Sequence, residues 1–190
     1  VRAGGNHGIA LKSDGTVWFT DPSYGCLQFP PECYLPNSVY RFDPKNGDLS
    51  VVTGDLKMPN GIAFSLDEKI LYLIDSAAIQ APGAYYQSNP HAIYAFDVGG
   101  DGKTLSNKRT LAVISPGFPD GMRLDKEGNI YVGAMDGVHV LNPQGKLIGK
   151  VLLPKQTANL TFGGKDNNVL FICSSDSIWA IKLNTQGAKA

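Results

Sequence analysis

The sequence has no excess charge of either sign and no long hydrophobic run. Its 190 residues contain 17 Lys and Arg and 17 Asp and Glu, so the formal net charge at pH 7 is zero. A neutral chain has no electrostatic attraction to nucleic acid or to an anionic membrane. The longest apolar runs, such as 70–74, are far shorter than the ~20 residues of a membrane-spanning helix. We therefore expect a globular protein that binds neither nucleic acid nor membrane.

Cysteine is also scarce. The three cysteines, an odd number, argue against a complete disulfide framework. Cys26 and Cys33 flank a proline-rich loop, where a local disulfide and two free thiols are both possible, so the cellular compartment stays open. Cys173 lies in an apolar run and is expected in the core. The three histidines do not have the spacing of a zinc site.

No stretch shows sustained helical periodicity, which leaves short β-strands as the main element. The 22 glycines and 12 prolines fit a chain of many turns. Short runs rich in Val, Ile, Tyr and Phe separate these turns and are typical of strands. We predict strands within 8–11, 17–21, 38–43, 48–52, 59–64, 70–75, 92–97, 109–113, 119–124, 130–133, 137–141, 146–151, 158–162 and 169–172.

One motif recurs along the chain: a polar residue, glycine, an apolar pair, a turn and an apolar strand. Its copies span 6–21, 59–75 and 119–133, and a degenerate fourth copy spans 158–172. Repeats of about 40–50 residues are typical of propeller blades. The sequence therefore predicts an all-β fold, a β-propeller with about four blades, over residues 1–190. Because each blade buries its faces against neighbouring blades, either four blades close the ring or further blades lie upstream of this sequence, and we expect the second.

Four segments resemble the SMP-30/gluconolactonase/LRE family in the order that this family has. They are 14–25, 59–62, 119–122 and 158–164. The segments 24–28 and 137–143 look most like the fungal lactonohydrolase branch. The resemblance implies a six-bladed ring of which this sequence is the C-terminal portion, and it implies a small-molecule lactone as substrate. An N-terminal chain of the same propeller would then be a possible partner.

In three copies of the motif, an oxygen-bearing side chain stands just before the glycine. These are Asn60, Asp120 and, one position further back, Asn6. Equivalent positions of successive blades face the central channel, so the three side chains should converge. Amide and carboxylate oxygens suit Ca²⁺ better than Zn²⁺. Asn-Gly and Asp-Gly are also common turn dipeptides, so a purely backbone role is the alternative.

The family resemblance implies a metal site at these positions. It assigns Asn60 and Asp120 as ligands of Ca²⁺ or another divalent cation, with Asn6 lining the same site. The family's remaining ligand, an N-terminal glutamate, has no counterpart in this sequence. His7 stands where many family members have aspartate, which is a departure from the pattern.

The implied activity is a metal-dependent lactonase acting on sugar, aldono- or related lactones. The cation would polarise the lactone carbonyl, and a base would activate water. Asp120 and His7 are the two candidates for this base. A phosphotriesterase- or arylesterase-like hydrolase at the same site and a non-catalytic calcium-binding scaffold are the alternatives.

Two further groups of residues are expected near the channel. Asp21 and Asp75 end equivalent strands, where they could support a cation or hydrogen-bond to the following turn. Tyr24, the loop 22–37 and the insertion 76–90 should cover the channel mouth and influence substrate selection.

Overall fold

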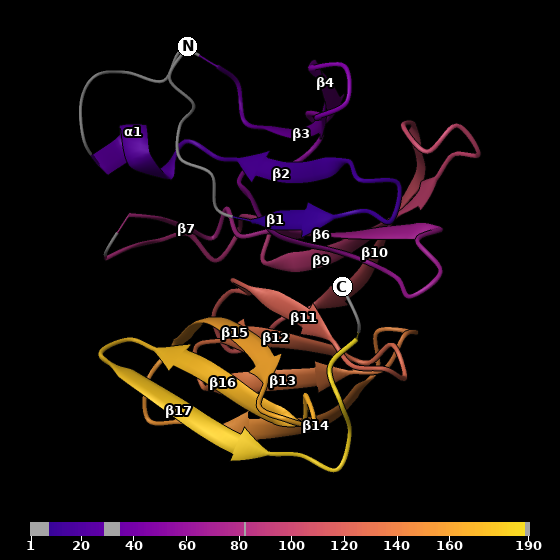
Figure 1. Cartoon of the computed structure of the whole chain (residues 1–190). Helices are drawn as coiled ribbons and strands as arrows, with labels where there is room; N and C mark the ends of the chain where they lie inside the picture. Colours follow the sequence, from indigo (N-terminus) through magenta and orange to yellow (C-terminus); the bar gives the residue numbers. More distant parts are fainter. Residues whose placement is uncertain (1–7, 29–34, 82, 189–190) are drawn as a thin grey trace.

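The computed structural model describes residues 8–28, 35–81 and 83–188, and these form four antiparallel sheets stacked one after another (Figure 1). The first sheet has the order β1-β2-β3-β4, the second β10-β9-β6-β5, the third β11-β12-β13-β14 and the fourth β15-β16-β17. Each sheet is one blade, and the all-β propeller predicted from the sequence is confirmed.

The strands follow the chain in order through the blades. The first blade contains β1 (Ile9–Leu11), β2 (Val17–Asp21), β3 (Ser38–Asp43) and β4 (Asp48–Thr53). The second contains β5 (Pro59–Phe64), β6 (Ile70–Asp75), β9 (Ala92–Val98) and β10 (Leu105–Val113). The third contains β11 (Met122–Leu124), β12 (Ile130–Ala134), β13 (Gly137–Leu141) and β14 (Leu147–Leu152), and the fourth contains β15 (Thr157–Gly163), β16 (Val169–Ser174) and β17 (Ser177–Lys182).

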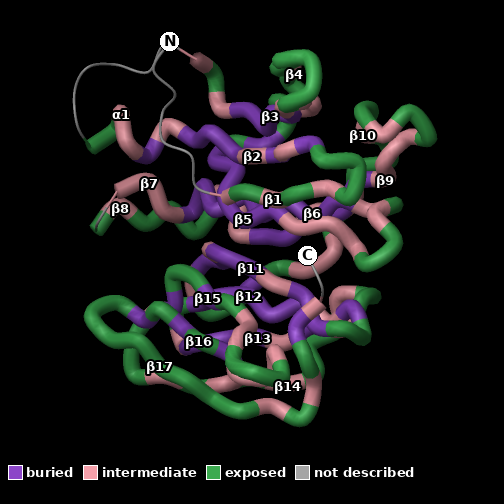
Figure 2. The backbone as a smooth tube through the Cα atoms, in the orientation of Figure 1, coloured by how far each residue is buried: buried purple, intermediate pink, exposed green. Residues whose placement is uncertain are grey.

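The hydrophobic core lies between successive blades. Trp18 of the first blade packs with Leu71 and Leu73 of the second, and all three side chains are fully buried. A second cluster joins blades two and three, and a third joins blades three and four. Figure 2 shows the buried residues in purple along strands such as β5 and β12. Because the central strand β12 is covered on both faces, all of its residues are buried, and its sequence reads as a continuous apolar run.

The glycine of the repeated motif lets neighbouring inner strands approach closely. A Cβ atom on Gly8 would lie 2.5 Å from the backbone oxygen of Asn60, and one on Gly61 would lie 2.5 Å from that of Asp120. A Cβ atom on Gly121 would lie 2.5 Å from Oδ1 of Asn159 in the fourth copy. Each motif glycine therefore packs against the polar position of the next blade, which explains why glycine occupies these sites.

Two elements lie outside the blade pattern and were not predicted. A short helix, α1 (Tyr24–Gln28), follows β2, and a small hairpin of β7 (Ile79–Ala81) and β8 (Ala84–Tyr85) occupies the insertion after β6. Helix α1 contacts β7, so the two additions lie against each other at one end of the blades (Figure 1).

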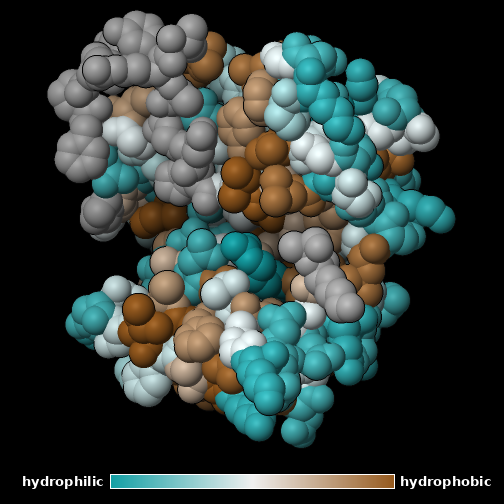
Figure 3. Space-filling view, viewed as in Figure 1, coloured by the Kyte–Doolittle hydropathy of each residue, from teal (hydrophilic) through white to brown (hydrophobic). Residues whose placement is uncertain are grey.

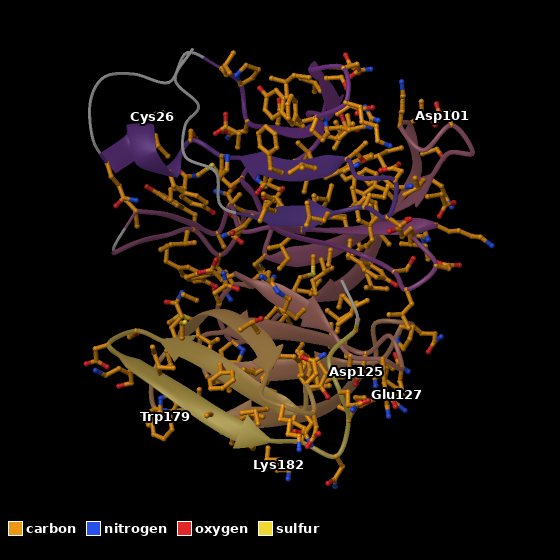
Figure 4. The ribbon with its side chains drawn as sticks, viewed as in Figure 1. Cys26, Asp101, Asp125, Glu127, Trp179 and Lys182 are labelled. Atoms are coloured by element: carbon orange, nitrogen blue, oxygen red, sulfur yellow. The ribbon has the colours of Figure 1, made fainter. Side chains whose placement is uncertain are left out.

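The fourth blade differs from the predicted four-stranded unit because it has three described strands. Its outermost strand, β17, was not predicted, is exposed along its whole length and carries Trp179 and Lys182 (Figure 4). The prediction that Cys173 lies in the core is wrong. In β16, Leu170 and Ile172 are buried, whereas Cys173 points to the opposite, exposed face.

Apolar side chains also reach the surface at the first blade. Ile9 and Leu11 of β1 are exposed, and Figure 3 shows apolar side chains gathered over this strand. Within the described residues, no helix has the length and apolar character needed to cross a membrane.

Candidate functional site

Asn60 and Asp120 line the same cavity, as the repeat predicted for them. Asn60 lies on β5 of the second blade, and Asp120 lies just before β11 of the third. The two strands contact each other, and the cavity has a volume of about 600 Å³. Asn6 and His7 lie outside the described residues, so their proposed roles stay predictions.

For each member of the pair, a hydroxyl group from the preceding blade holds the backbone at or next to that residue. The Thr20 hydroxyl donates to the backbone oxygen of Asn60 at 2.7 Å, and the Ser76 hydroxyl donates to that of Pro119 at 2.5 Å. The backbone N–H of Asp120 donates to the oxygen of Gly133 at 3.1 Å. Thr20 and Ser76 are therefore positioning residues, which the sequence analysis missed because their hydroxyls carry no distinctive pattern.

The electrostatics of the pair are set by burial. Burial raises the pKa of Asp120 from 3.8 to about 6, and a hydrogen bond from the Asn60 side chain offsets part of this increase. None of the ion pairs between described residues includes Asp120. At neutral pH the cavity thus holds a carboxylate whose charge no described cation balances.

Tyr24, from helix α1, lies beside the pair and lines the same cavity. Its hydroxyl donates to the backbone oxygen of Ser76 at 3.1 Å. Burial, followed by the negative charge of Asp120, raises the pKa of Tyr24 above its usual value. Tyr24 therefore remains a neutral phenol at physiological pH and closes one side of the cavity, as predicted for this residue, whereas residues 29–34 of the predicted loop 22–37 lie outside the described residues.

The donor set fits a hard divalent cation better than a soft one. Asn60 supplies an amide oxygen and Asp120 a carboxylate, and neither a cysteine thiolate nor an imidazole lines the described part of the cavity. The buried, unbalanced carboxylate would be stabilised by a bound cation. No group of three or more His, Cys, Asp and Glu side chains suited to a metal occurs within residues 8–28, 35–81 and 83–188. Since Ca²⁺ takes about six to eight oxygen ligands, carbonyl oxygens, water or further residues would complete the shell.

The sequence left two roles open for Asp75, support of a cation and hydrogen bonding to a turn. The structure shows the second, because the carboxylate holds a turn. It accepts hydrogen bonds from the backbone N–H groups of Lys57, Met58 and Ala77 at 2.8, 3.0 and 3.2 Å. A carboxylate with three backbone donors is a structural group rather than a free ligand. Asp21, at the equivalent strand end, is likewise buried.

The remainder of the cavity wall comes largely from the insertion after β6. Ile79, Gln80, Ala81 and Tyr85 of the β7–β8 hairpin line it, together with residues Phe118, Met135, Gln28 and Gln156 from elsewhere in the chain. The expectation that the insertion borders the channel mouth is confirmed. Phe118 and Met135 were missed, although Phe118 lies only two residues before Asp120 and could have been noticed for that reason.

Cys26 lies on α1, close to this wall (Figure 4). It is disulfide-bonded, whereas Cys173 is a free thiol. Cys33, the partner considered in the sequence, lies outside the described residues.

The fold and the site together define a class: a β-propeller whose inner strands bring an amide and a carboxylate to one cavity. The chain belongs to the SMP-30/Gluconolactonase/LRE-like family, whose model matches residues 5–176. The family resemblance seen in the sequence is thereby confirmed.

Three similar proteins illustrate this membership. The lactonohydrolase oryH of Aspergillus oryzae is 35% identical over 162 residues, which are 79% of this chain and 34% of that protein. The structure of XC5397 from Xanthomonas campestris, described as a gluconolactonase, superposes with a TM-score of 0.81 at 30% identity, covering 96% of this chain and 58% of the other. A calcium-binding regucalcin from Agrobacterium tumefaciens shares the fold, with a TM-score of 0.73 at 17% identity over 97% of this chain and 62% of its own.

The chain is shorter than these relatives. It spans about a third to a half of the length of the curated relatives it matches.

Proposed function

We propose that the protein hydrolyses lactones and that Asn60 and Asp120 hold a divalent cation, with Ca²⁺ as the first candidate, at the centre of the reaction. The observation that carries this proposal is the position of the two side chains at one cavity, where the Asp120 carboxylate is buried and lacks a described cationic partner. The names of the relatives, a lactonohydrolase and a gluconolactonase, support the reaction class. The calcium-binding regucalcin supports the choice of cation.

The residues of the cavity have distinct tasks in this reaction. When bound, the cation would supply Lewis-acid polarisation of the lactone carbonyl. Asn60 would orient the Asp120 carboxylate through their hydrogen bond. A water molecule must lose a proton to attack the carbonyl carbon, and either the Asp120 carboxylate or the imidazole of His7 would accept it. The proton would then reach the ring oxygen as the ester bond breaks, leaving a hydroxy acid.

The proposal is tested by following acid release in a pH-stat from a panel of aldono- and aliphatic lactones. The intact protein is assayed with Ca²⁺ and with EDTA, alongside the variants Asp120→Ala and Asn60→Ala. Asp176→Ala, which removes an exposed carboxylate outside the cavity, serves as the matched control. We expect hydrolysis that is lost with chelator and in both cavity variants, and retained in the control.

Two results would contradict the proposal. Hydrolysis that persists in EDTA would exclude the cation. Failure on every lactone by a folded protein that binds calcium would favour the esterase-like activity or the calcium-binding scaffold considered above.

A further inference from the structure

The cavity around Asp120 has two sides of different chemistry. Tyr24, Asn60 and Asp120 form its polar end. The rest of the lining comes from the β7–β8 hairpin, Phe118 and Met135, with Gln28 and Gln156, and we call the hairpin with Phe118 and Met135 the apolar wall. The wall begins next to the polar end, because Phe118 lies two residues before Asp120 in the chain.

The apolar wall is held in place by contacts from several elements. The rings of Tyr85 and Phe118 lie 6.2 Å apart between centroids, in a tilted arrangement. The Tyr85 hydroxyl donates to the backbone oxygen of Gly117 at 3.3 Å, which ties the tip of the hairpin to the segment that leads to Asp120. Phe118 is buried, and helix α1 contacts β7. The wall is thus part of the fold and is present before any ligand binds.

The wall offers few hydrogen-bonding groups to a ligand with many hydroxyl groups, because its side chains are mainly aromatic or aliphatic and the amides in the lining are limited to Asn60 and to Gln28, Gln80 and Gln156. The hydroxyls of Tyr24 and Tyr85 already donate to backbone oxygens. A sugar hydroxyl placed against the aromatic and aliphatic side chains would lose its hydrogen bonds to water without a replacement. An alkyl or aryl group in the same place would gain free energy by leaving water.

We infer that the apolar wall binds an apolar substituent of the substrate, so that the preferred substrates are lactones with an alkyl or aryl side chain rather than polyhydroxylated aldonolactones. This inference rests on the proposed lactone hydrolysis and specifies its substrate class. Tyr85 and Met135 are specificity-determining residues in this assignment, since both line the cavity and both are partly accessible.

The test uses a series of lactones with the same six-membered ring. The kcat/KM of the intact protein, with Ca²⁺, is measured for δ-valerolactone, δ-hexalactone, δ-octalactone, δ-decalactone and δ-gluconolactone. We expect kcat/KM to increase along the alkyl series by about fourfold for each methylene group that becomes buried. The longer alkyl lactones should also exceed δ-gluconolactone.

Two variants and a matched control assign the effect to the wall. Tyr85→Ala and Met135→Ser should flatten the dependence of kcat/KM on chain length, read as the ratio of δ-decalactone to δ-valerolactone. Tyr86→Ala removes the neighbouring exposed tyrosine, which does not line the cavity, and should leave this ratio unchanged.

The outcomes separate this inference from the proposed function. If no lactone in the series is hydrolysed, the proposed function fails. If lactones are hydrolysed but δ-gluconolactone is preferred and chain length has no effect, the function stands and the apolar specificity is overturned. If chain length matters equally in the wild type and in both variants, the apolar wall is not the binding site and the assignment is overturned.

Discussion

Replacing Asp120 with asparagine should stabilise the metal-free protein while it removes the activity. The substitution keeps the shape of the side chain and an oxygen that can accept the Asn60 hydrogen bond, but it removes the buried charge. Burial raises the pKa of Asp120 from 3.8 to about 6. Each pKa unit corresponds to about 1.4 kcal/mol, so the buried charge costs up to about 3 kcal/mol above pH 6.

The dependence on pH follows from the direction of this shift. Between about pH 4 and 6 the folded protein binds more protons at Asp120 than the unfolded chain does, so the free energy of unfolding falls as pH rises. Above pH 6 this loss of stability is complete, and below pH 4 it is absent. Asp120→Asn should therefore exceed the wild type in stability at pH 7.5 by about 1–3 kcal/mol and match it near pH 4.

The assay is urea denaturation of the intact protein in EDTA at pH 7.5 and near pH 4, with wild type and variant compared at each pH. Saturating Ca²⁺ at pH 7.5 should reverse the order, because only the wild type gains from binding. The reasoning is refuted if Asp120→Asn is less stable than the wild type in EDTA at pH 7.5. A stability difference that does not change with pH would also refute it.

Three further predictions test the architecture of the blades. Gly61→Ala should destabilise the protein by about 2–3 kcal/mol in a urea melt, because the new Cβ would lie 2.5 Å from the backbone oxygen of Asp120. The control Gly149→Ala, where a Cβ would have nothing within 4 Å, should change stability by less than about 0.5 kcal/mol. Asp75→Asn should cost about 1–3 kcal/mol through weaker acceptance of three backbone N–H groups, and calcium affinity measured on the folded variant should not change. Cys173 should react with a maleimide in the native protein without reductant, and Cys173→Ser should abolish that labelling; slow labelling of the wild type would contradict the exposed position.

The blades could be predicted from the sequence, and so could the position of Asn60 and Asp120 at one cavity, because both depend on a repeated sequence pattern. The motif glycines recur in register, and the structure gives each a steric reason, since Gly61 packs against the Asp120 backbone. Once the repeat fixes the inner strands, equivalent positions must approach the same axis. Burial between blades then makes a central strand such as β12 apolar on both faces, which the sequence shows directly.

The remaining features depend on contacts that no local sequence pattern indicates. Helix α1 has five residues, too few for a helical period to be visible. The β7–β8 hairpin lies in an insertion without regular alternation, and Tyr85 joins the cavity only through its contacts with Phe118 and Gly117. The prediction for Cys173 failed because its strand reads as a continuous apolar run, although only alternate residues of β16 are buried.

The central claim is that Asn60 and Asp120 hold a divalent cation, and calcium binding to the intact protein tests it most directly. Isothermal titration of Ca²⁺ into the wild type, Asn60→Ala, Asp120→Asn and the exposed control Asp176→Asn separates a cavity site from surface binding. We expect one site in the wild type and the control, and a loss of affinity of tenfold or more in both cavity variants. Equal affinity in all four proteins would contradict it.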